Sequence, residues 1–322
     1  MRIENLVRLI NAKLIAKPQI SSVDNFAISL KDVSLGSAFL SSDEKEINEA
    51  IENGAYAVIF DKKCEVENSE IAYIKVDNLD KAKLRIAQFF AVSNSVKNLF
   101  LRPAEKEILK NSTLSRNAKF LSKNLDEVFI NFINSKKGDV FLYDDLEFLK
   151  EISPIYETLN LKNDAKILID GSLFFLNFEY KDRIFNLNLP QIFLPEAYSI
   201  LNFMDKNNVF IKFKDLRNIG HFESIFVDKF YNIKAFGESY RAFIVESDTR
   251  LFLREVKFLK DKFGKEIISM SSKKLNLKSD IEYDSLEEIK TSYDFKYAVV
   301  LANKQDVVDM LNSKKKELSL FD

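Results

Sequence analysis

Short apolar segments alternate with helix-forming segments along this chain, and the alternation restricts its fold more than any other feature of the sequence. Residues 33–61 are typical: they predict a short strand, a helix over EKEINEAIENGA, a Gly-Ala turn and the strand YAVIF. Near the C-terminus EIISMS, SLEEIKTS, YAVVLAN and KQDVVDMLNSKKKEL repeat the order strand, helix, strand, helix. Strands that alternate with helices form parallel sheets. We therefore expect an α/β fold.

The chain has 322 residues, which is enough for two or three domains. We expect three consecutive domains, formed by residues 1–95, 96–224 and 225–322, of which the first and third are α/β units. Within the middle domain, residues 165–189 alternate apolar and polar side chains for long enough to predict two or three antiparallel strands. Asp170-Gly171 is the candidate for a hairpin turn there.

Glycine is scarce, with seven residues in the whole chain. No two of them stand close enough in sequence to surround a phosphate group with backbone N–H donors. Gly54 and Gly264 each follow a predicted helix, and Gly54 stands where a helix end favours positive φ. The helix before Gly264 has four apolar residues available for burial: Leu251, Val256, Leu259 and Phe263.

The charge balance argues against one large class of function. The chain carries 48 basic and 49 acidic residues, which gives a formal net charge of −1. Dedicated nucleic-acid binders need a basic surface to attract the phosphate backbone, so we expect no nucleic-acid partner. The 29 phenylalanines lie within alternating or helical apolar patterns, which indicates core packing.

Cysteine usage and the N-terminal segment indicate the cellular compartment. Cys64 is the single cysteine, so an intramolecular disulfide, a zinc cluster or an iron–sulfur site cannot be built from thiols, and we expect a reducing compartment. The N-terminal MRIENLVRLINAKLI is interrupted by polar residues and predicts an amphipathic helix, not a secretory signal. No apolar run approaches the ~20 residues needed to span a bilayer. We expect a cytoplasmic protein without a membrane span.

The segment AIENGAYAVIF, residues 50–60, and the residues before it carry a family pattern. The matching positions are Ser29, Leu30, Lys31, Val33, Gly36, Phe39, Ala50, Ile51, Gly54, Ala55 and Val58. On these positions the first region resembles the N-terminal domain of the Mur ligases, particularly those that add the third amino acid and the final dipeptide to peptidoglycan precursors. The resemblance implies a three-domain architecture. It puts Ser29 and Lys31 at substrate-contacting positions and Phe39 in the wall of that pocket.

The resemblance continues along the chain but departs from the family at the motifs that handle ATP. Where the family has T-G-T-N-G-K-T, this sequence has RPAE at residues 102–105. A phosphate loop needs glycines, a lysine and a magnesium-binding hydroxyl, whereas proline lacks an N–H and glutamate adds negative charge. Similarly, YD at residues 143–144 and ANK at residues 302–304 replace the family's magnesium-linked glutamate and its Lys-Gly-Ser. We expect a reduced central domain and no cofactor.

These departures lead to the hypothesis of a non-catalytic Mur ligase-like protein, a pseudoenzyme. It would bind a UDP-linked cell-wall precursor or a cell-wall enzyme, as a scaffold or regulator in or near bacterial peptidoglycan precursor synthesis. One alternative is an active cell-wall ligase with a remodelled nucleotide site, which needs a replacement set of phosphate donors. The other alternative is an unrelated metal-dependent enzyme that uses His221 and Glu223.

Two groups of polar residues have both a chemical and a structural interpretation. His221 is the single histidine, and in GHFES it could join Glu223 in a two-ligand metal site or a general-base pair. Asp144, Asp145 and Glu147 form an acidic cluster that could bind magnesium. Acidic residues are also stabilising in the first turn of a helix, and we favour this explanation for the cluster.

Overall fold

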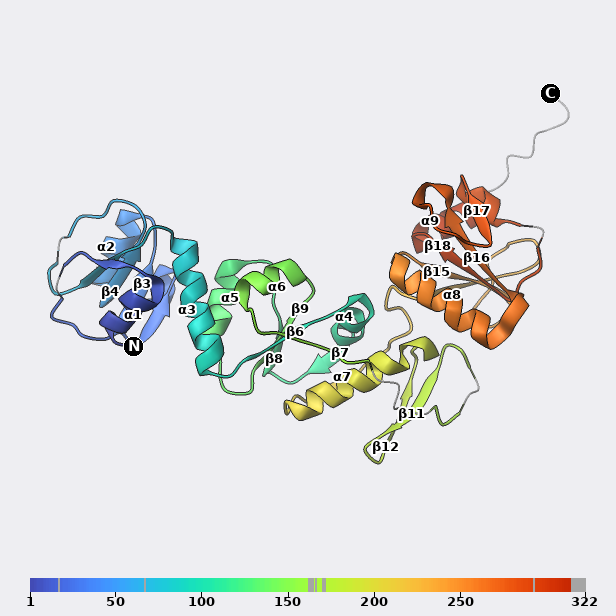
Figure 1. Cartoon of the computed structure of the whole chain (residues 1–322), viewed down its shortest axis with the longest axis horizontal. Helices are drawn as coiled ribbons and strands as arrows, with labels where there is room; N and C mark the ends of the chain where they lie inside the picture. The colour runs from blue at the N-terminus through green and yellow to red at the C-terminus, as the bar shows by residue number, and fades with distance from the viewer. Residues whose placement is uncertain are drawn as a thin grey trace, which may run out of the picture. The chain divides into compact units, whose positions relative to one another are not determined.

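The computed structural model describes residues 1–16, 18–66, 68–161, 165, 167–169, 172–291 and 293–313. It has the mixed α/β architecture that the alternating pattern predicts (Figure 1). The chain divides into two compact units. The first contains residues 1–102, 114–160 and 202–211, and the second contains residues 103–113, 161–201 and 212–322. Among the described residues, no helix combines the length and the apolar character needed to cross a membrane.

The first unit begins with a five-stranded sheet in the order β1-β5-β4-β3-β2. Its strands are β1 (Lys13–Leu14), β2 (Asn25–Ala27), β3 (Ser37–Leu40), β4 (Ala57–Phe60) and β5 (Ala72–Lys75). Strands β2 to β5 are parallel, and β1 is antiparallel to β5. The helices of this part are α1 (Ile3–Ile10), α2 (Glu44–Glu52) and α3 (Leu79–Ser93).

Successive side chains of a strand point to opposite faces of the sheet, so these strands place apolar residues on both faces. Phe39 and Val58 pack in a cluster with Ile47 of α2. Their strand neighbours Leu40 and Ile59 belong instead to a larger cluster that includes residues of α1 and α3. Every residue of β3 and β4 is buried, which explains why both strands read as continuous apolar runs.

Local side-chain and backbone chemistry fixes the ends of α2. The Asp43 side chain accepts a hydrogen bond from Lys45 N at 2.8 Å and caps the N-terminus. Gly54, just beyond the C-terminus, has φ +99°, which confirms the predicted positive φ. Gly36, at φ +90°, donates its N–H to Gly54 O at 3.0 Å, and a Cβ there would lie 2.6 Å from Asp24 Oδ2. Both positions therefore require glycine.

A second sheet in the same unit has the order β10-β6-β9-β8, and all its strands are parallel. Its strands are β6 (Lys97–Phe100), β8 (Ala118–Phe120), β9 (Val140–Tyr143) and β10 (Glu157–Thr158). The helices of this part are α5 (Leu125–Ile133) and α6 (Leu146–Ile152). Phe129 of α5 meets Phe26 of β2 edge to face, with ring centroids 6.5 Å apart, so the two sheets share one apolar cluster.

The second unit contains an antiparallel hairpin of β11 (Leu176–Tyr180) and β12 (Arg183–Leu187), as residues 165–189 predicted. Its turn is formed by Lys181 and Asp182, with φ 46° and 60°. Positive φ at both central residues is the mark of a type I′ turn. The turn predicted at Asp170-Gly171 falls on residues outside the described part of the chain.

The remaining sheet has the order β14-β15-β18-β16-β17. Its strands are β14 (Glu223–Val227), β15 (Arg241–Glu246), β16 (Ile267–Ser272), β17 (Ile281–Tyr283) and β18 (Tyr297–Leu301). Only β14 is antiparallel to its neighbour, so the parallel sheet predicted for the C-terminal region is confirmed. The helices that follow β15 and β18 are α8 (Thr249–Phe263) and α9 (Lys304–Asn312).

The buried face of α8 differs from the expected one. Its buried residues are Phe252, Glu255 and Leu259, at spacings of three and four that place them on one side of the helix. Three of the four residues expected there are only half-buried: Leu251, Val256 and Phe263. The helix therefore presents a glutamate to the core. A prediction that considers only the apolar residues of the helix does not include it.

The remaining elements complete the described structure. The other helices are α4 (Pro103–Lys110) and α7 (Leu194–Lys206), and the other strands are β7 (Ser112–Leu114) and β13 (Ile211–Phe213). The 3₁₀ helices are η1 (Leu30–Asp32), η2 (Gln191–Phe193), η3 (Gly264–Glu266), η4 (Lys273–Leu275) and η5 (Leu286–Ile289).

Candidate functional site

Buried ionisable residues of the second unit lie near the carboxyl edge of the C-terminal sheet. Ligands of open α/β sheets bind beyond the carboxyl ends of the parallel strands. Strand β15 ends at Glu246 on this edge. Because β14 is antiparallel to β15, with Glu223 opposite Val245, the start of β14 lies on the same edge. The register thus brings the segment before β14, which holds His221, next to Glu246.

Glu246 is 1% exposed, and its carboxylate accepts hydrogen bonds from several directions. His221 Nδ1 lies 3.0 Å from Oε1, and the ring nitrogen donates to this oxygen when it carries the proton. The backbone N–H groups of Ser247 and Asp248 each donate to Oε1 at 2.8 Å, and that of Phe222 donates to Oε2 at 3.3 Å. A buried negative charge at Glu246 is therefore well solvated by the protein.

His221 is held between two residues with left-handed backbone. Gly220 has φ +76° and Phe222 has φ +52°. A positive φ is strained in a bulky residue such as phenylalanine. Strained backbone conformations are found most often at functional sites. Burial opposes the charged imidazolium, but the hydrogen bond and the negative charge of Glu246 outweigh it and raise the pKa of His221. The ring therefore holds its second proton to higher pH than an exposed histidine does.

Glu255 of α8 is the second buried carboxyl group of this site. It is fully buried, and neither of its side-chain oxygens makes a hydrogen bond of good geometry among the described residues, although the Glu246 carboxyl group lies close enough to interact with it. Burial, followed by the negative charge of Glu246, raises the pKa of Glu255 well above its usual range. A carboxyl group that burial keeps protonated, as here at Glu255, can act as a proton donor.

The structure gives His221 a different partner from Glu223, the one considered in the metal-dependent alternative. Glu223 forms an ion pair with Lys304 at 2.9 Å, whereas His221 binds Glu246. The alternative in which His221 and Glu223 act as a pair is therefore not what the structure shows, because β-strand register and not sequence proximity selects the partner. Within the described ranges, no group of three or more His, Cys, Asp and Glu residues could hold a metal ion.

Ser29, Lys31 and Phe39 are the residues expected to bind substrate in the first domain. Ser29 is half-buried immediately before η1, and its carbonyl accepts the N–H of Asp32 at 3.0 Å. Lys31 is exposed. Phe39 is fully buried in β3, inside the cluster beneath α2. Phe39 thus contributes to the core of this sheet, and the two polar residues stand near the surface.

The connection between β6 and α4 lies at the position where the resemblance puts the family's phosphate loop. Strand β6 ends at Phe100 and α4 begins at Pro103, so only Leu101 and Arg102 lie between them. The Arg102 guanidinium donates to Leu159 O at 2.6 Å. Pro103 contributes no N–H, and Glu105 is buried in the first turn of the helix. The first turn of α4 therefore contains a carboxyl group at the end of the helix where its dipole favours negative charge.

The acidic cluster after β9 follows the structural interpretation that we favoured. Asp145 caps α6 by accepting the N–H of Phe148 at 2.9 Å, and it pairs with Lys123 at 2.9 Å. Glu147 pairs with Lys150 at 2.8 Å. The hydrogen bond from Phe148 N, followed by the one from Lys123, lowers the pKa of Asp145. Two of the three carboxylates are therefore engaged in helix capping and surface ion pairs.

The sequence contained signals for the two carboxyl groups that we missed. Glu246 ends the apolar run AFIV, where a charged residue in a buried strand is costly. Glu255 stands three residues after Phe252 and four before Leu259, on the apolar stripe of its helix. A search for charged residues inside apolar patterns would have found both.

Comparisons with known proteins are informative only at the level of solved structures. No protein-family model matches the chain, and no curated protein matches it. The chain is similar to the MurF ligase of Thermotoga maritima in complex with ADP, at 14% identity and a TM-score of 0.41, over 90% of this chain and 97% of that one. MurF from Acinetobacter baumannii is similar at 11% identity and a TM-score of 0.40, over 93% and 85%. A UDP-N-acetylmuramoyl-L-alanyl-D-glutamate–2,6-diaminopimelate ligase is similar at 10% identity and a TM-score of 0.39, over 96% and 98%.

Proposed function

We propose that this chain is a Mur ligase-like pseudoenzyme that acts in or near peptidoglycan precursor synthesis. It has no ATP site and binds a UDP-linked precursor or a cell-wall enzyme in the cytoplasm of a bacterium. The observation that carries the proposal is the two-residue connection between β6 and α4. A ligase that holds ATP in a phosphate loop needs a glycine-rich segment at such a strand-to-helix junction.

The chemistry of that connection supports the absence of ATP binding. Helix N-termini bind phosphate through free backbone N–H groups and the positive end of the helix dipole. Here the first helical residue is Pro103, and Glu105 places a carboxyl group in the first turn. Arg102, the nearest cation in the sequence, already donates to Leu159 O. A triphosphate at this junction would meet few donors and an acidic side chain.

The sequence pattern of the first domain supports the link to cell-wall precursors. The segment from Ser29 to Val58 carries the matching positions, and its Gly36 and Gly54 have the positive φ that the pattern requires. Ser29 offers a hydroxyl and Lys31 an exposed cation, which suit a diphosphate or a carboxylate. We retain the division into domains 1–95, 96–224 and 225–322 as part of the proposal.

Calorimetric titration of two ligands tests the proposal. ATP with magnesium should give no measurable heat of binding, with an active Mur ligase as the positive control. UDP-N-acetylmuramoyl peptide should bind to the wild-type chain, and Lys31→Glu should weaken that binding several-fold without lowering the melting temperature. Lys45→Glu changes an exposed lysine on α2 in the same way and serves as the matched control.

Each result has a distinct meaning for the proposal. Micromolar affinity for ATP would overturn the pseudoenzyme and favour an active ligase with a remodelled nucleotide site. Absence of precursor binding to the wild-type chain would remove the precursor as the ligand and leave a cell-wall enzyme as the partner. Equal loss of binding in Lys31→Glu and Lys45→Glu would remove Lys31 from the site.

A further inference from the structure

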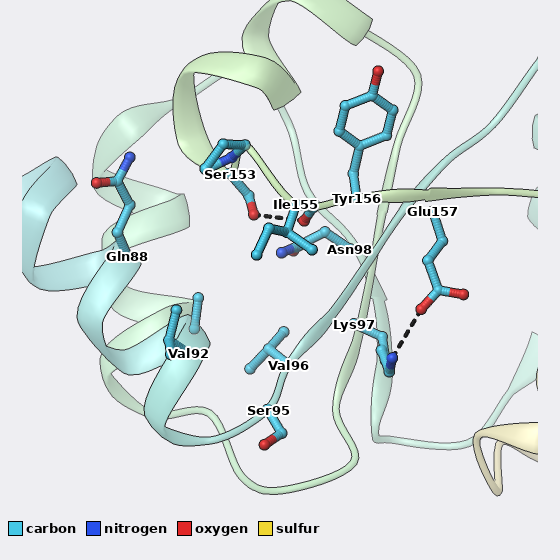
Figure 2. Close-up of a pocket in the computed structure, with 12 residues that line it drawn as sticks. Gln88, Val92, Ser95, Val96, Lys97, Asn98, Ser153, Ile155, Tyr156 and Glu157 are labelled. Atoms are coloured by element: carbon cyan, nitrogen blue, oxygen red, sulfur yellow. Dashed lines mark hydrogen bonds and ion pairs between the residues drawn. The ribbon is translucent and has the colours of Figure 1, made fainter.

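A cavity of about 420 Å³ lies in the first unit, at the amino ends of the parallel strands β6 and β10. The last turns of α3, the start of β6 and the segment that links α6 to β10 enclose it (Figure 2). The connection between β6 and α4 lies at the opposite end of β6. The volume of the cavity falls within the range typical of small-molecule sites.

Aliphatic side chains form the walls of this cavity. The apolar lining residues are Ala91, Val92, Val96, Pro154 and Ile155. Figure 2 shows Val92 and Val96 on one side and Ile155 on the other, across the open space. Val92 is 73% exposed and Ile155 is 77% exposed, although both residues are strongly apolar. Covering them would remove apolar surface from water, which favours binding of an apolar group.

Asn98 directs the nitrogen end of its amide into this cavity (Figure 2). It lies on β6 beside Phe141 of β9, and only 4% of its surface is exposed. Its Oδ1 has almost no accessible surface, so Nδ2 is the atom of this amide that a ligand can reach. Among the described residues, Nδ2 has no acceptor. An amide nitrogen can only donate, so the group that it favours on a ligand is a hydrogen-bond acceptor.

The other polar groups of the lining offer little to a charged ligand. Among the described residues that line the cavity, Lys97 and Glu157 are the charged ones, and they pair with each other at 2.9 Å. The Ser153 hydroxyl donates to Ile155 O at 2.7 Å, and Figure 2 shows the Tyr156 hydroxyl directed away from the open space. An ionised ligand would lose its hydration here without gaining an unpaired opposite charge, so the cavity favours a neutral one.

We propose that this cavity binds a neutral, largely aliphatic carbonyl compound whose oxygen accepts a hydrogen bond from Asn98 Nδ2. The aliphatic walls bind the body of the ligand, and the amide nitrogen selects a ketone, ester or amide oxygen on it. This site is separate from the positions discussed for ATP and for the precursor, so it stands or falls independently of the proposed function. Its ligand differs from a UDP-linked precursor in having no charge.

A matched pair of small probes tests the site. The ketone 4-methyl-2-pentanone has a carbonyl oxygen on a branched aliphatic chain, and the alkene 2,4-dimethyl-1-pentene has the same skeleton with a CH₂ group in place of that oxygen. Each is titrated into the full chain with isotope-labelled Ile and Val methyl groups and Asn side-chain amides. We expect both probes to shift the NMR methyl signals of Val92, Val96 and Ile155. The ketone alone should move the Asn98 Nδ2 proton signals downfield, as a new hydrogen bond does.

The variant Asn98→Leu separates the hydrogen bond from the apolar contact. Measured against the alkene, the ketone should bind roughly two- to tenfold more weakly to Asn98→Leu than to the wild-type chain, because the variant lacks the donor. Asn5→Leu, at an exposed asparagine of α1, is the control and should leave the ratio of the two affinities unchanged.

Three results would overturn the proposal. The first is that neither probe shifts the three methyl signals, and the second is that Asn98→Leu keeps the wild-type ratio of affinities. The third is that the two probes move the Asn98 Nδ2 proton signals alike. This last measurement uses the wild-type chain, so it decides the question even if Asn98→Leu does not fold.

Discussion

At the scale of single residues, the buried carboxyl group of Glu255 is the clearest case of a side chain whose charge depends on the fold. Burial and the neighbouring Glu246 raise its pKa. The pKa of His221 is raised too, against the effect of burial, by its bond to Glu246. A group whose pKa is higher in the folded state binds its proton more tightly there. Its contribution to stability is therefore complete below the unfolded pKa and is lost as pH rises through the folded pKa.

Glu255→Gln should remove one of these two pH-dependent contributions. For each pH unit between the unfolded and folded pKa values of Glu255, the wild-type chain should lose about 1.4 kcal/mol of unfolding free energy relative to the variant. Urea unfolding at pH 5, 6, 7 and 8 measures the difference, which should grow with pH in favour of Glu255→Gln. Glu52→Gln, at the exposed last residue of α2, should show a small difference that is independent of pH.

The opposite outcome has a specific meaning. A difference between wild type and Glu255→Gln that stays constant from pH 5 to pH 8 would show that Glu255 binds no more protons in the folded chain than in the unfolded chain, so that folding does not raise its pKa. The carboxyl pair with Glu246 would then have no proton to transfer near neutral pH.

At the scale of elements, helix caps account for much of the agreement between sequence and structure. Asn124 caps α5 by accepting the N–H groups of Asp126 and Glu127 at 2.9 and 3.1 Å. This helix buries Val128, Phe129 and Phe132 in the core of the first unit. The cap therefore fixes the end of a helix on which that core depends.

Asn124→Ala should lower the free energy of unfolding by about 1 kcal/mol, because two N–H groups of the first turn lose their acceptor. Asn124→Asp should restore most of the loss, since a carboxylate accepts the same hydrogen bonds. Urea unfolding of the three proteins at pH 7 gives the comparison. Equal stability of wild type and Asn124→Ala would mean that water replaces the cap at no cost.

At the scale of the whole molecule, the apolar cluster that joins the first two sheets decides which parts unfold together. Phe26 of the first sheet meets Phe129 of α5, which covers the second sheet. The C-terminal sheet has a cluster of its own, which includes Val307 of α9. We therefore expect the first two sheets to lose stability together and the C-terminal sheet to respond separately.

Phe129→Ala removes a ring from the shared cluster and should cost about 3–5 kcal/mol. Hydrogen exchange should then accelerate at the amides of both β4 and β9, while those of β15 and β18 stay protected. Val307→Ala is the matched control and should accelerate exchange in β15 and β18 alone. Faster exchange in β9 without any change in β4 would show that the two sheets unfold independently.

Much of the local structure could be predicted from the sequence. The alternating pattern predicted the α/β class, and the strand YAVIF and the helix before it are present as β4 and α2. The antiparallel strands around residues 176–187 and the parallel C-terminal sheet are also present. These features depend on side-chain periodicity and on residues such as Gly54, whose conformational freedom acts within one turn.

The sequence determined the class of fold, the helices and their caps, because each depends on neighbours a few residues away. Only the tertiary structure decided the partner of His221, since the register of β14 against β15 brings Glu246 beside it across 25 positions in sequence. It also decided the high pKa of Glu255 and the unpaired oxygen of Asn98. Both follow from burial, and burial depends on which distant segments cover a residue once the chain has folded.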